Sequence, residues 1–226
     1  MAQKMATKTK QVELEEVSEL VVTKITPKGI TAVIKNVALN WVFLATPAED
    51  KTDPLRAQYR TQMVLRGGEK AFVAEMKQAL TQYLKGAAVA WGADIRMKTL
   101  NNALMLDVDK SLFKQTDNGL CLNAHQSVRR ETEVDEFVAK YPPVVRLQDG
   151  NDCPASLITS EFYSGTIADV AVYIAAYEVD AGRGITIYLN GVRKIANGER
   201  IAGTDPFADV PATKLIEAQK GKSMLI

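Results

Sequence analysis

The sequence predicts a mainly β protein: a small antiparallel β-barrel with one main helix, a large insertion and flexible termini. Residues 171–190, AVYIAAYEVDAGRGITIYLN, place runs of β-branched and aromatic residues on both sides of a short glycine-containing segment, as in a β-hairpin. Earlier in the chain, further strand-like stretches precede one clear helical pattern. The strands do not alternate with helices as in a parallel sheet, which favours the antiparallel barrel.

The hairpin has two different faces when it is read with the period of two that strands impose. One face is apolar and is predicted to face the core: Val172, Ile174, Ala176, Ile185, Ile187 and Leu189. The other face carries Tyr173, Tyr177 and Tyr188. A tyrosine has an apolar ring and a hydroxyl that prefers water or a partner. These rings therefore either pack beneath the insertion or form a binding surface.

The N-terminal part predicts a tail followed by strands. Residues 1–17 are polar and are expected to form a flexible tail. Residues 20–44 are strand-like, with a turn at Pro27-Lys28-Gly29 and a long strand from about Thr31 to Leu44. The polar segment TPAEDKTDPLRA is predicted to be a loop, and a second strand is expected over 58–66.

A helix is predicted directly after Gly67-Gly68. Within EKAFVAEMKQALTQYLKG, the apolar residues recur at helical spacing and are expected to face the core: Phe72, Met76, Leu80 and Tyr83. The helix spans 69–85 and is expected to close one end of the barrel. Residues 87–165 form the insertion. It is predicted to contain strands at 104–109 and 120–127 and a short helix at 131–141.

Composition indicates one elaborated domain over 18–203, with a C-terminal tail over 204–226. The net charge is +1, but residues 56–98 hold eight Lys or Arg and three acidic residues, which is compatible with a polyanion partner or with an ordinary basic surface. No apolar run approaches a membrane span, and residues 1–16 lack the hydrophobic core of a secretory signal, so none is expected there. With only two cysteines, an intracellular protein without membrane partners is expected.

Catalytic and metal sites find little support in the sequence. His125 lies four residues after Cys121, with Cys153 further on, but there is no Cys-x-x-Cys pair and no evident fourth zinc ligand. We therefore interpret His125 as a surface or pocket residue and predict no metal, no cofactor and no catalytic residue. Asp107 and Asp109 leave a Mg²⁺-dependent nuclease as an alternative.

The barrel pattern is compatible with an OB-fold, whose central strands and bordering loops bind single strands. Such sites combine flat rings that stack on bases with cations that follow the phosphates. The candidate nucleic-acid-binding residues are Trp41, Phe43, Arg56, Tyr59, Arg60, Gln62, Arg66, Tyr173, Tyr177, Arg183 and Tyr188. Trp41 and Phe43 share a strand face, and for such large apolar rings a core position is favoured over stacking.

The chain also resembles a family of bacteriophage OB-fold single-stranded DNA-binding proteins. The resemblance rests on LNAHQS (122–127), PPVVRLQDG (142–150), EFYSGTIADVAVYIAAYEV (161–179) and GITIYLNGVRKIANGERIAG (184–203). It extends to WVFLATP…YRTQMVL (41–65), which looks like the first two strands of that family. Gly165 of the Phe-Tyr-Ser-Gly motif is expected to make the turn into the hairpin.

This resemblance implies a non-enzymatic protein that coats single-stranded DNA during phage replication, recombination or repair. It would act in the cytoplasm of the infected bacterial host, with phage or host replication and recombination proteins as further partners and homo-oligomers as an option. The end of this sequence, GKSMLI, is not the acidic tail of many replication proteins, so recruitment through the tail is in doubt. A structural virion or scaffold protein, with the tyrosine face as a subunit contact, remains an alternative.

Overall fold

A computed structural model describes residues 17–49, 56–86, 91–131, 136–138, 142–180 and 182–201. Its elements are β1 (Glu19–Thr26), β2 (Gly29–Glu49), β3 (Arg56–Val64), α1 (Glu69–Gly86), α2 (Ala93–Leu104), β4 (Phe113–Thr116), β5 (Gly119–Glu131), β6 (Glu136–Val138), β7 (Val144–Arg146), η1 (Ala155–Leu157), α3 (Ile158–Glu161), β8 (Ile167–Val179) and β9 (Gly182–Ala196). Apart from Val17, the two predicted tails lie outside the described residues.

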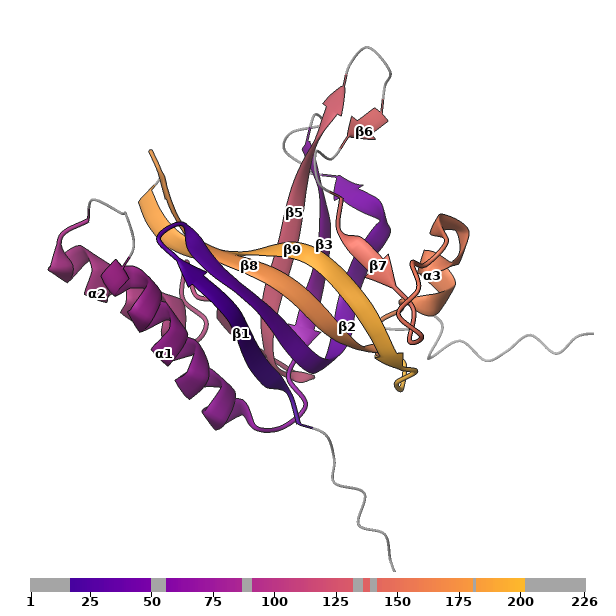
Figure 1. The fold of residues 1–226 in the computed structure, drawn as a ribbon, viewed down its shortest axis with the longest axis horizontal. Coiled ribbons are helices and arrows are strands. Elements are labelled where there is room, and N and C mark those ends of the chain that lie inside the picture. Colours follow the sequence, from indigo (N-terminus) through magenta and orange to yellow (C-terminus); the bar gives the residue numbers. More distant parts are fainter. Residues whose placement is uncertain are drawn as a thin grey trace, which may run out of the picture.

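Five of the strands form a barrel (Figure 1). β2 pairs antiparallel with β3 and with β8, β3 pairs with β5, and β8 pairs with β9. The ring is completed where β5 meets β9 in a parallel bridge between His125 and Tyr188. A five-stranded, partly open barrel of this kind is an OB-fold, and the predicted fold class is confirmed.

The apolar faces of these strands fill the barrel. Ile30 and Ile34 of β2, Val172 and Ile174 of β8, and Leu189 of β9 have no exposed surface. Side chains alternate between the two faces of a strand, so the apolar positions of the hairpin all reach the core, and only Ala176 is half-buried. The prediction of an apolar inner face and a tyrosine outer face is confirmed.

Helix α1 packs against β1 (Figure 1), and its buried side chains belong to the same hydrophobic core as those of β2, β8 and β9. Its predicted core residues are all buried: Phe72, Met76, Leu80 and Tyr83. The Tyr83 hydroxyl donates a hydrogen bond to the carbonyl of Lys28 (3.3 Å) and accepts one from the backbone N–H of Ala176 (3.1 Å). The helix is thereby joined both to the turn between β1 and β2 and to β8.

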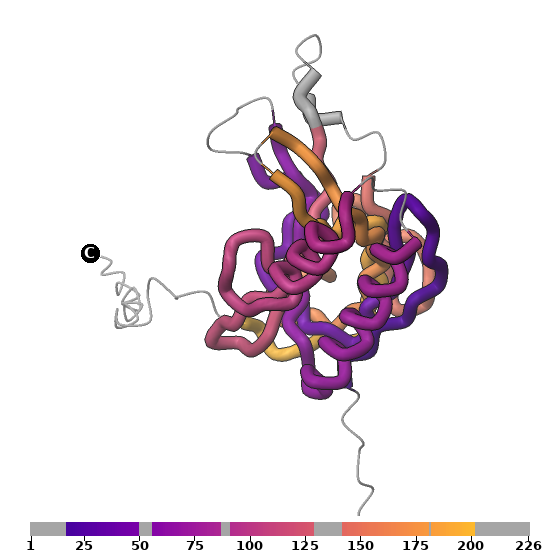
Figure 2. Tube along the Cα trace, turned by 90° about the vertical axis from the view of Figure 1, so that its left-hand side faces the viewer, coloured from indigo at the N-terminus to yellow at the C-terminus, as the bar shows by residue number. Residues whose placement is uncertain are grey.

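The segment that follows α1 differs from the prediction. Residues 93–104 form a second helix, α2, which lies beside α1 in front of the strands (Figure 2). The strand predicted at 104–109 is wrong, because this segment is a series of bends and turns in which only Leu106 bridges to Phe113. Helix α2 buries only Thr99, Leu100 and Ala103, and so few buried positions leave no clear helical stripe in the sequence.

The short helix predicted at 131–141 is also wrong. Strand β5 continues to Glu131 and pairs with β6, while 132–135 and 139–141 lie outside the described residues. β5 is itself one of the five barrel strands, so the predicted insertion supplies part of the barrel. The first predicted loop is shorter than expected, because β2 runs to Glu49 and β3 starts at Arg56.

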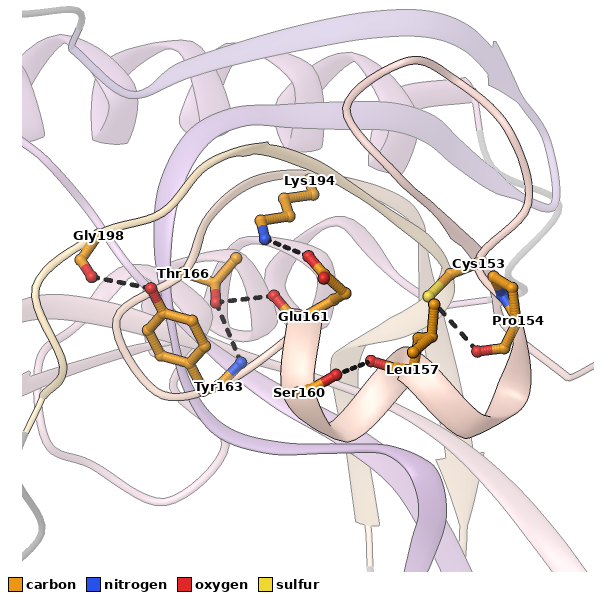
Figure 3. A network of polar contacts seen from close by, with 9 residues as sticks. All are labelled: Cys153, Pro154, Leu157, Ser160, Glu161, Tyr163, Thr166, Lys194 and Gly198. Carbon is orange, nitrogen blue, oxygen red and sulfur yellow. Dashed lines mark hydrogen bonds and ion pairs between the residues drawn. The ribbon is translucent and has the colours of Figure 1, made fainter.

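A polar network holds the turn that leads into β8 (Figure 3). Lys194 of β9, whose side chain is only 10% exposed, forms an ion pair with Glu161 of α3 (2.5 Å). The Thr166 hydroxyl accepts a hydrogen bond from the backbone N–H of Tyr163 (3.0 Å). Gly165 has a φ of +113°, and a Cβ there would lie 1.9 Å from a carbonyl oxygen of the segment after β9. Only glycine fits this turn, as expected from the Phe-Tyr-Ser-Gly motif.

Candidate nucleic-acid interface

A continuous row of outward-facing side chains crosses all five barrel strands. Cross-strand register places Phe43 of β2 opposite Arg60 of β3, Arg60 opposite His125 of β5, His125 opposite Tyr188 of β9, and Tyr188 opposite Tyr173 of β8. We call these five residues the aromatic row. Neighbours in the same register position on paired strands have their side chains on the same face, which explains how distant parts of the sequence form one surface.

Ring geometry places three of the four neighbouring pairs of the aromatic row in contact range, and the fourth pair, Arg60 and His125, is related by strand register. The Arg60 guanidinium carbon lies 4.9 Å from the centre of the Phe43 ring. The ring centres of His125 and Tyr188 are 5.8 Å apart, and those of Tyr188 and Tyr173 are 6.3 Å apart in a stacked arrangement. These separations are typical of favourable cation–π and aromatic pairs. Flat rings and one cation therefore follow one another across the barrel.

Tyr173 and Tyr188 are not equally available to a ligand. The Tyr173 ring covers Gly29, where an added Cβ would lie 2.5 Å from the ring. Burial raises the pKa of the Tyr173 hydroxyl, with smaller contributions from Tyr83 and Tyr188. Tyr188 stands between the rings of Tyr173 and His125. It is therefore the tyrosine through which the role of the row is best tested.

A polar cleft adjoins the row where β3 and β5 lie side by side. The Asn40 amide donates a hydrogen bond to the side-chain oxygen of Gln62 (3.0 Å), and the Gln62 amide donates one to the side-chain oxygen of Asn123 (3.3 Å). These three residues form an amide ladder across β2, β3 and β5. The cleft has a volume of about 330 Å³, and its lining is Trp41, Gln58, Arg60, Thr61, Gln62, Asn123, Ala124 and His125.

Trp41 projects from the edge of this cleft. The β2–β3 register shifts between Asn40 and Phe43, as at a β-bulge, and Trp41 has a φ of +50°. Its backbone N–H donates a hydrogen bond to the side-chain oxygen of Asn40 (3.0 Å), and Thr61 donates one to the Asn40 carbonyl (3.2 Å). Trp41 is 62% exposed, so the core position favoured for it is wrong. A bulky residue with positive φ is costly, and such strain is characteristic of functional sites.

Four of the other predicted residues lie on β3 or directly after it. Gln62 is the centre of the amide ladder, whereas the Tyr59 ring is half-buried and packs against the core. Arg56 is exposed at the start of the strand. Arg66, just beyond its end, donates a hydrogen bond to the side-chain oxygen of Asn36 (2.5 Å). The structure thus brings Gln62 to the cleft and directs Tyr59 inward.

Tyr177 and Arg183 lie near the tip of the hairpin, away from the aromatic row. The Tyr177 ring packs on Gly184, four residues from Tyr173 along β8. Arg183 forms an ion pair with Glu178 (2.5 Å), and its guanidinium carbon lies 5.9 Å from the Trp91 ring centre.

The Trp91 indole N–H also donates a hydrogen bond to Glu178 (2.9 Å). This bond, followed by the one from Arg183, lowers the pKa of the Glu178 carboxyl. Arg183 therefore already has a carboxylate partner, instead of standing free at a loop tip.

Sequence reasoning missed three residues of the site: His125 as a member of the row, and Asn40 and Asn123 as members of the ladder. The alternation of apolar and polar residues in LNAHQS does indicate that Asn123 and His125 share an outer face. Their partners, however, depend on the register of β5 against β3 and β9. That register is decided by the whole barrel and not by local sequence.

Burial lowers the pKa of His125 below the value of 6.5 for a free histidine. A lowered pKa means that the unfolded chain takes up a proton more readily, so this contribution to stability is present above pH 6.5 and is lost as pH falls through the folded pKa. We expect His125→Gln to reduce the fall in unfolding free energy between neutral and mildly acidic pH. Urea titrations at both pH values measure this. An identical pH dependence in wild type and variant would contradict it.

The described residues contain no group of three or more His, Cys, Asp or Glu side chains placed to hold a metal ion. Asp107 lies in the turn region after α2 and accepts a hydrogen bond from the backbone N–H of Gln115 (3.1 Å). The Cys121 thiol is buried, which raises its pKa, and it contacts the carbonyl of Lys114. No helix in the described part of the chain is long and apolar enough to cross a membrane.

An OB-fold barrel with exposed rings and an arginine beside a polar cleft has the features of the nucleic-acid-binding OB-fold proteins. The chain belongs to the family of the single-stranded DNA-binding protein of Enterobacter phage Enc34, whose family model matches residues 30–216. No curated protein is significantly similar in sequence.

Solved structures of the bacteriophage Enc34 single-stranded DNA-binding protein share the fold at 15% sequence identity. Its C-terminal truncation matches with a TM-score of 0.52, covering 80% of this chain and 97% of that chain. Its complex with single-stranded DNA matches with a TM-score of 0.51, covering 81% of this chain and 99% of that chain. At this identity the likeness concerns the fold, and the residues of the site are argued from the present structure.

Proposed function

We propose that the protein binds single-stranded DNA without sequence specificity, by stacking bases on Trp41 and the aromatic row and by contacting phosphates through Arg60. The observation that carries this proposal is the row of rings and one cation across the barrel, next to a strongly exposed tryptophan. Membership of a single-stranded DNA-binding family supports it, as does the existence of a DNA complex for a protein of similar fold.

The chemistry of the surface favours sequence-tolerant binding. Every base has a flat π-face, and stacking on an aromatic side chain contributes about 1–3 kcal/mol per base regardless of its identity. In the amide ladder, Asn40, Gln62 and Asn123 already bond to one another. Their side chains therefore have fewer donors and acceptors left to recognise base edges. The cleft is polar, but it is not built to distinguish one base from another.

The biological role follows from this chemistry and from the family. The protein coats transient single strands during replication, recombination or repair of phage DNA, in the cytoplasm of the infected bacterial host. It does so as a binding protein, without turnover and without a cofactor. Arg60 and the rings bind the strand noncovalently, and release is governed by salt and by competition from other strands.

A labelled oligothymidylate titration, with Mg²⁺ and with chelator, tests this function. We expect saturable binding that is unchanged by chelator, weakens with salt and leaves the strand intact. Cleavage that needs Mg²⁺ would instead support a nuclease that uses Asp107 and Asp109. Absence of binding at low salt would leave the outer tyrosine face as a contact between protein subunits.

Arg60 and Arg183, two of the four arginines among the candidate binding residues, are expected to behave differently. Arg60→Ala should lower the slope of log affinity against log salt by roughly 0.7, the value for one lost phosphate contact on a single strand. Arg183→Ala is the matched control, because Arg183 is already paired with Glu178. Fluorescence anisotropy over a salt series measures both slopes. Equal salt slopes for Arg60→Ala and wild type would show that Arg60 does not contact a phosphate.

A further inference from the structure

A second hollow lies on the outer face of β2, β8 and β9, beyond the tyrosines of the aromatic row. Its volume is about 390 Å³. Ala171 lies two residues from Tyr173 on β8 and pairs with both Val33 and Gly191. Two residues of a strand span about 7 Å, and positions two apart share a face. The hollow therefore continues the surface on which Tyr173 and Tyr188 lie.

Strand β7 forms one wall of this hollow and brings in a second arginine. β7 pairs parallel with β9, and Arg146 lies directly opposite Arg193. Two like charges in directly opposite positions destabilise a sheet. Arg193 is neutralised by Asp169, whose side chain is 9% exposed, at 2.5 Å. The charges of Arg193 and Asp169 thus already balance each other within the structure.

Arg146 is held much more loosely than Arg193. It contacts Asp152 at 3.3 Å, and the side chains of the two residues are 55% and 82% exposed. An ion pair this exposed contributes little to stability, so exchange of its partner costs little. A guanidinium with a weak partner, next to a second guanidinium, is well suited to bind the two oxygens of a phosphate.

The rest of the lining is mainly apolar. Val33, Val144 and Ala171 contribute its floor and wall, and Val144 is 50% exposed. Asn190 is exposed at the side of the hollow nearer to Tyr188. The volume falls in the range of small-ligand sites. An apolar floor with arginines at one side suits the flat base and sugar of a nucleotide whose phosphate is near the arginines.

We propose that this hollow, which we call the arginine pocket, is a further nucleotide subsite for the DNA strand after it crosses Tyr188 and Tyr173. Its phosphate contact is Arg146, and its base or sugar rests on Val33, Val144 and Ala171. The inference rests on the proposed function and extends the binding path from the cleft at Trp41 to the β7 side of the barrel.

A length series of labelled oligothymidylates tests the arginine pocket. For short strands that fill only the cleft and the aromatic row, Arg146→Ala and wild type should have equal affinity. Strands long enough to reach β7 should bind Arg146→Ala about tenfold more weakly, the cost of one charged hydrogen-bonded contact. Their salt slope should fall by roughly 0.7. Asp152→Asn, which removes the weak partner of Arg146, should tighten binding of long strands.

A second variant changes the apolar floor of the arginine pocket instead of the charge of Arg146. Ala171→Leu fills the hollow and is expected to weaken binding of long strands only, with the melting temperature measured in parallel. The arginine pocket is refuted if both variants bind every length as wild type does, or if they lose affinity equally at all lengths. If the wild-type protein binds no strand of any length, the proposed function is refuted, and the proposed subsite is refuted with it.

Discussion

Replacing Trp41 by asparagine is expected to weaken single-stranded DNA binding by about 1–3 kcal/mol while leaving the melting temperature unchanged or raised. The ring is 62% exposed, so its loss removes little packing. The backbone at this position has a φ of +50°, which asparagine adopts more readily than tryptophan. Binding should therefore weaken without any loss of stability, as expected for a strained residue kept for function. Anisotropy titrations and thermal melts measure the two quantities.

Met97→Asn is the matched control for this change. Met97 lies on α2, is 54% exposed and is absent from the cleft and the aromatic row. The control should bind DNA as wild type does. A Trp41→Asn variant that binds normally, or that loses binding only because it unfolds, would show that the exposed ring has no part in binding.

Replacing Tyr188 by leucine is expected to weaken binding by about 1–3 kcal/mol with a nearly unchanged salt slope, because a flat ring is lost and no charge. Tyr188 has ring neighbours on both sides, at 5.8 Å and 6.3 Å, so it is the middle one of the three consecutive rings His125, Tyr188 and Tyr173. Loss of these aromatic pairs should also lower stability by about 0.5–1.5 kcal/mol. Titrations at several salt concentrations and urea unfolding separate the two effects.

Tyr177→Leu provides the comparison for Tyr188→Leu. The Tyr177 ring lies on Gly184 near the tip of the same hairpin, outside the aromatic row. The Tyr177→Leu variant should bind DNA with wild-type affinity, although Tyr177 and Tyr188 belong to the same outer face. If the two variants lose affinity equally, the binding surface extends along the hairpin instead of across the strands. If neither loses affinity, the tyrosines serve packing.

The elements that could be predicted are those whose signal is local. The hairpin predicted within 171–190, which the structure extends to 167–196, and helix α1 each carry one apolar face with a clear period, and both predictions are confirmed. Helix α2 was missed because it buries few apolar residues. The predicted helix at 131–141 was wrong because β5 continues to pair along that stretch with β6. Pairing of this kind depends on a neighbouring strand and leaves little trace in the segment itself.

For the site, the residue types could be predicted but not their grouping. Phe43, Arg60, Tyr173 and Tyr188 were named from aromatic and basic composition, and the structure places them in one row. Tyr177 and Arg183 were named for the same reasons, yet they lie at the hairpin tip. Local sequence does not show that Glu178 and Trp91 already bind Arg183. Nor does it show that His125 completes the row between Arg60 and Tyr188.

The sequence by itself determined the apolar inner face of the barrel strands, the tyrosine outer face and helix α1. Each depends on a period of two or 3.6 residues that is set by local backbone geometry. Only the tertiary structure decided which outward side chains meet, because register across five strands and the bulge at Trp41 are set by closure of the whole barrel. That closure turned Trp41 outward and aligned His125 with Tyr188. The parallel pairing of β7 with β9 placed Arg146 beside Arg193, where the strand of DNA is expected to continue.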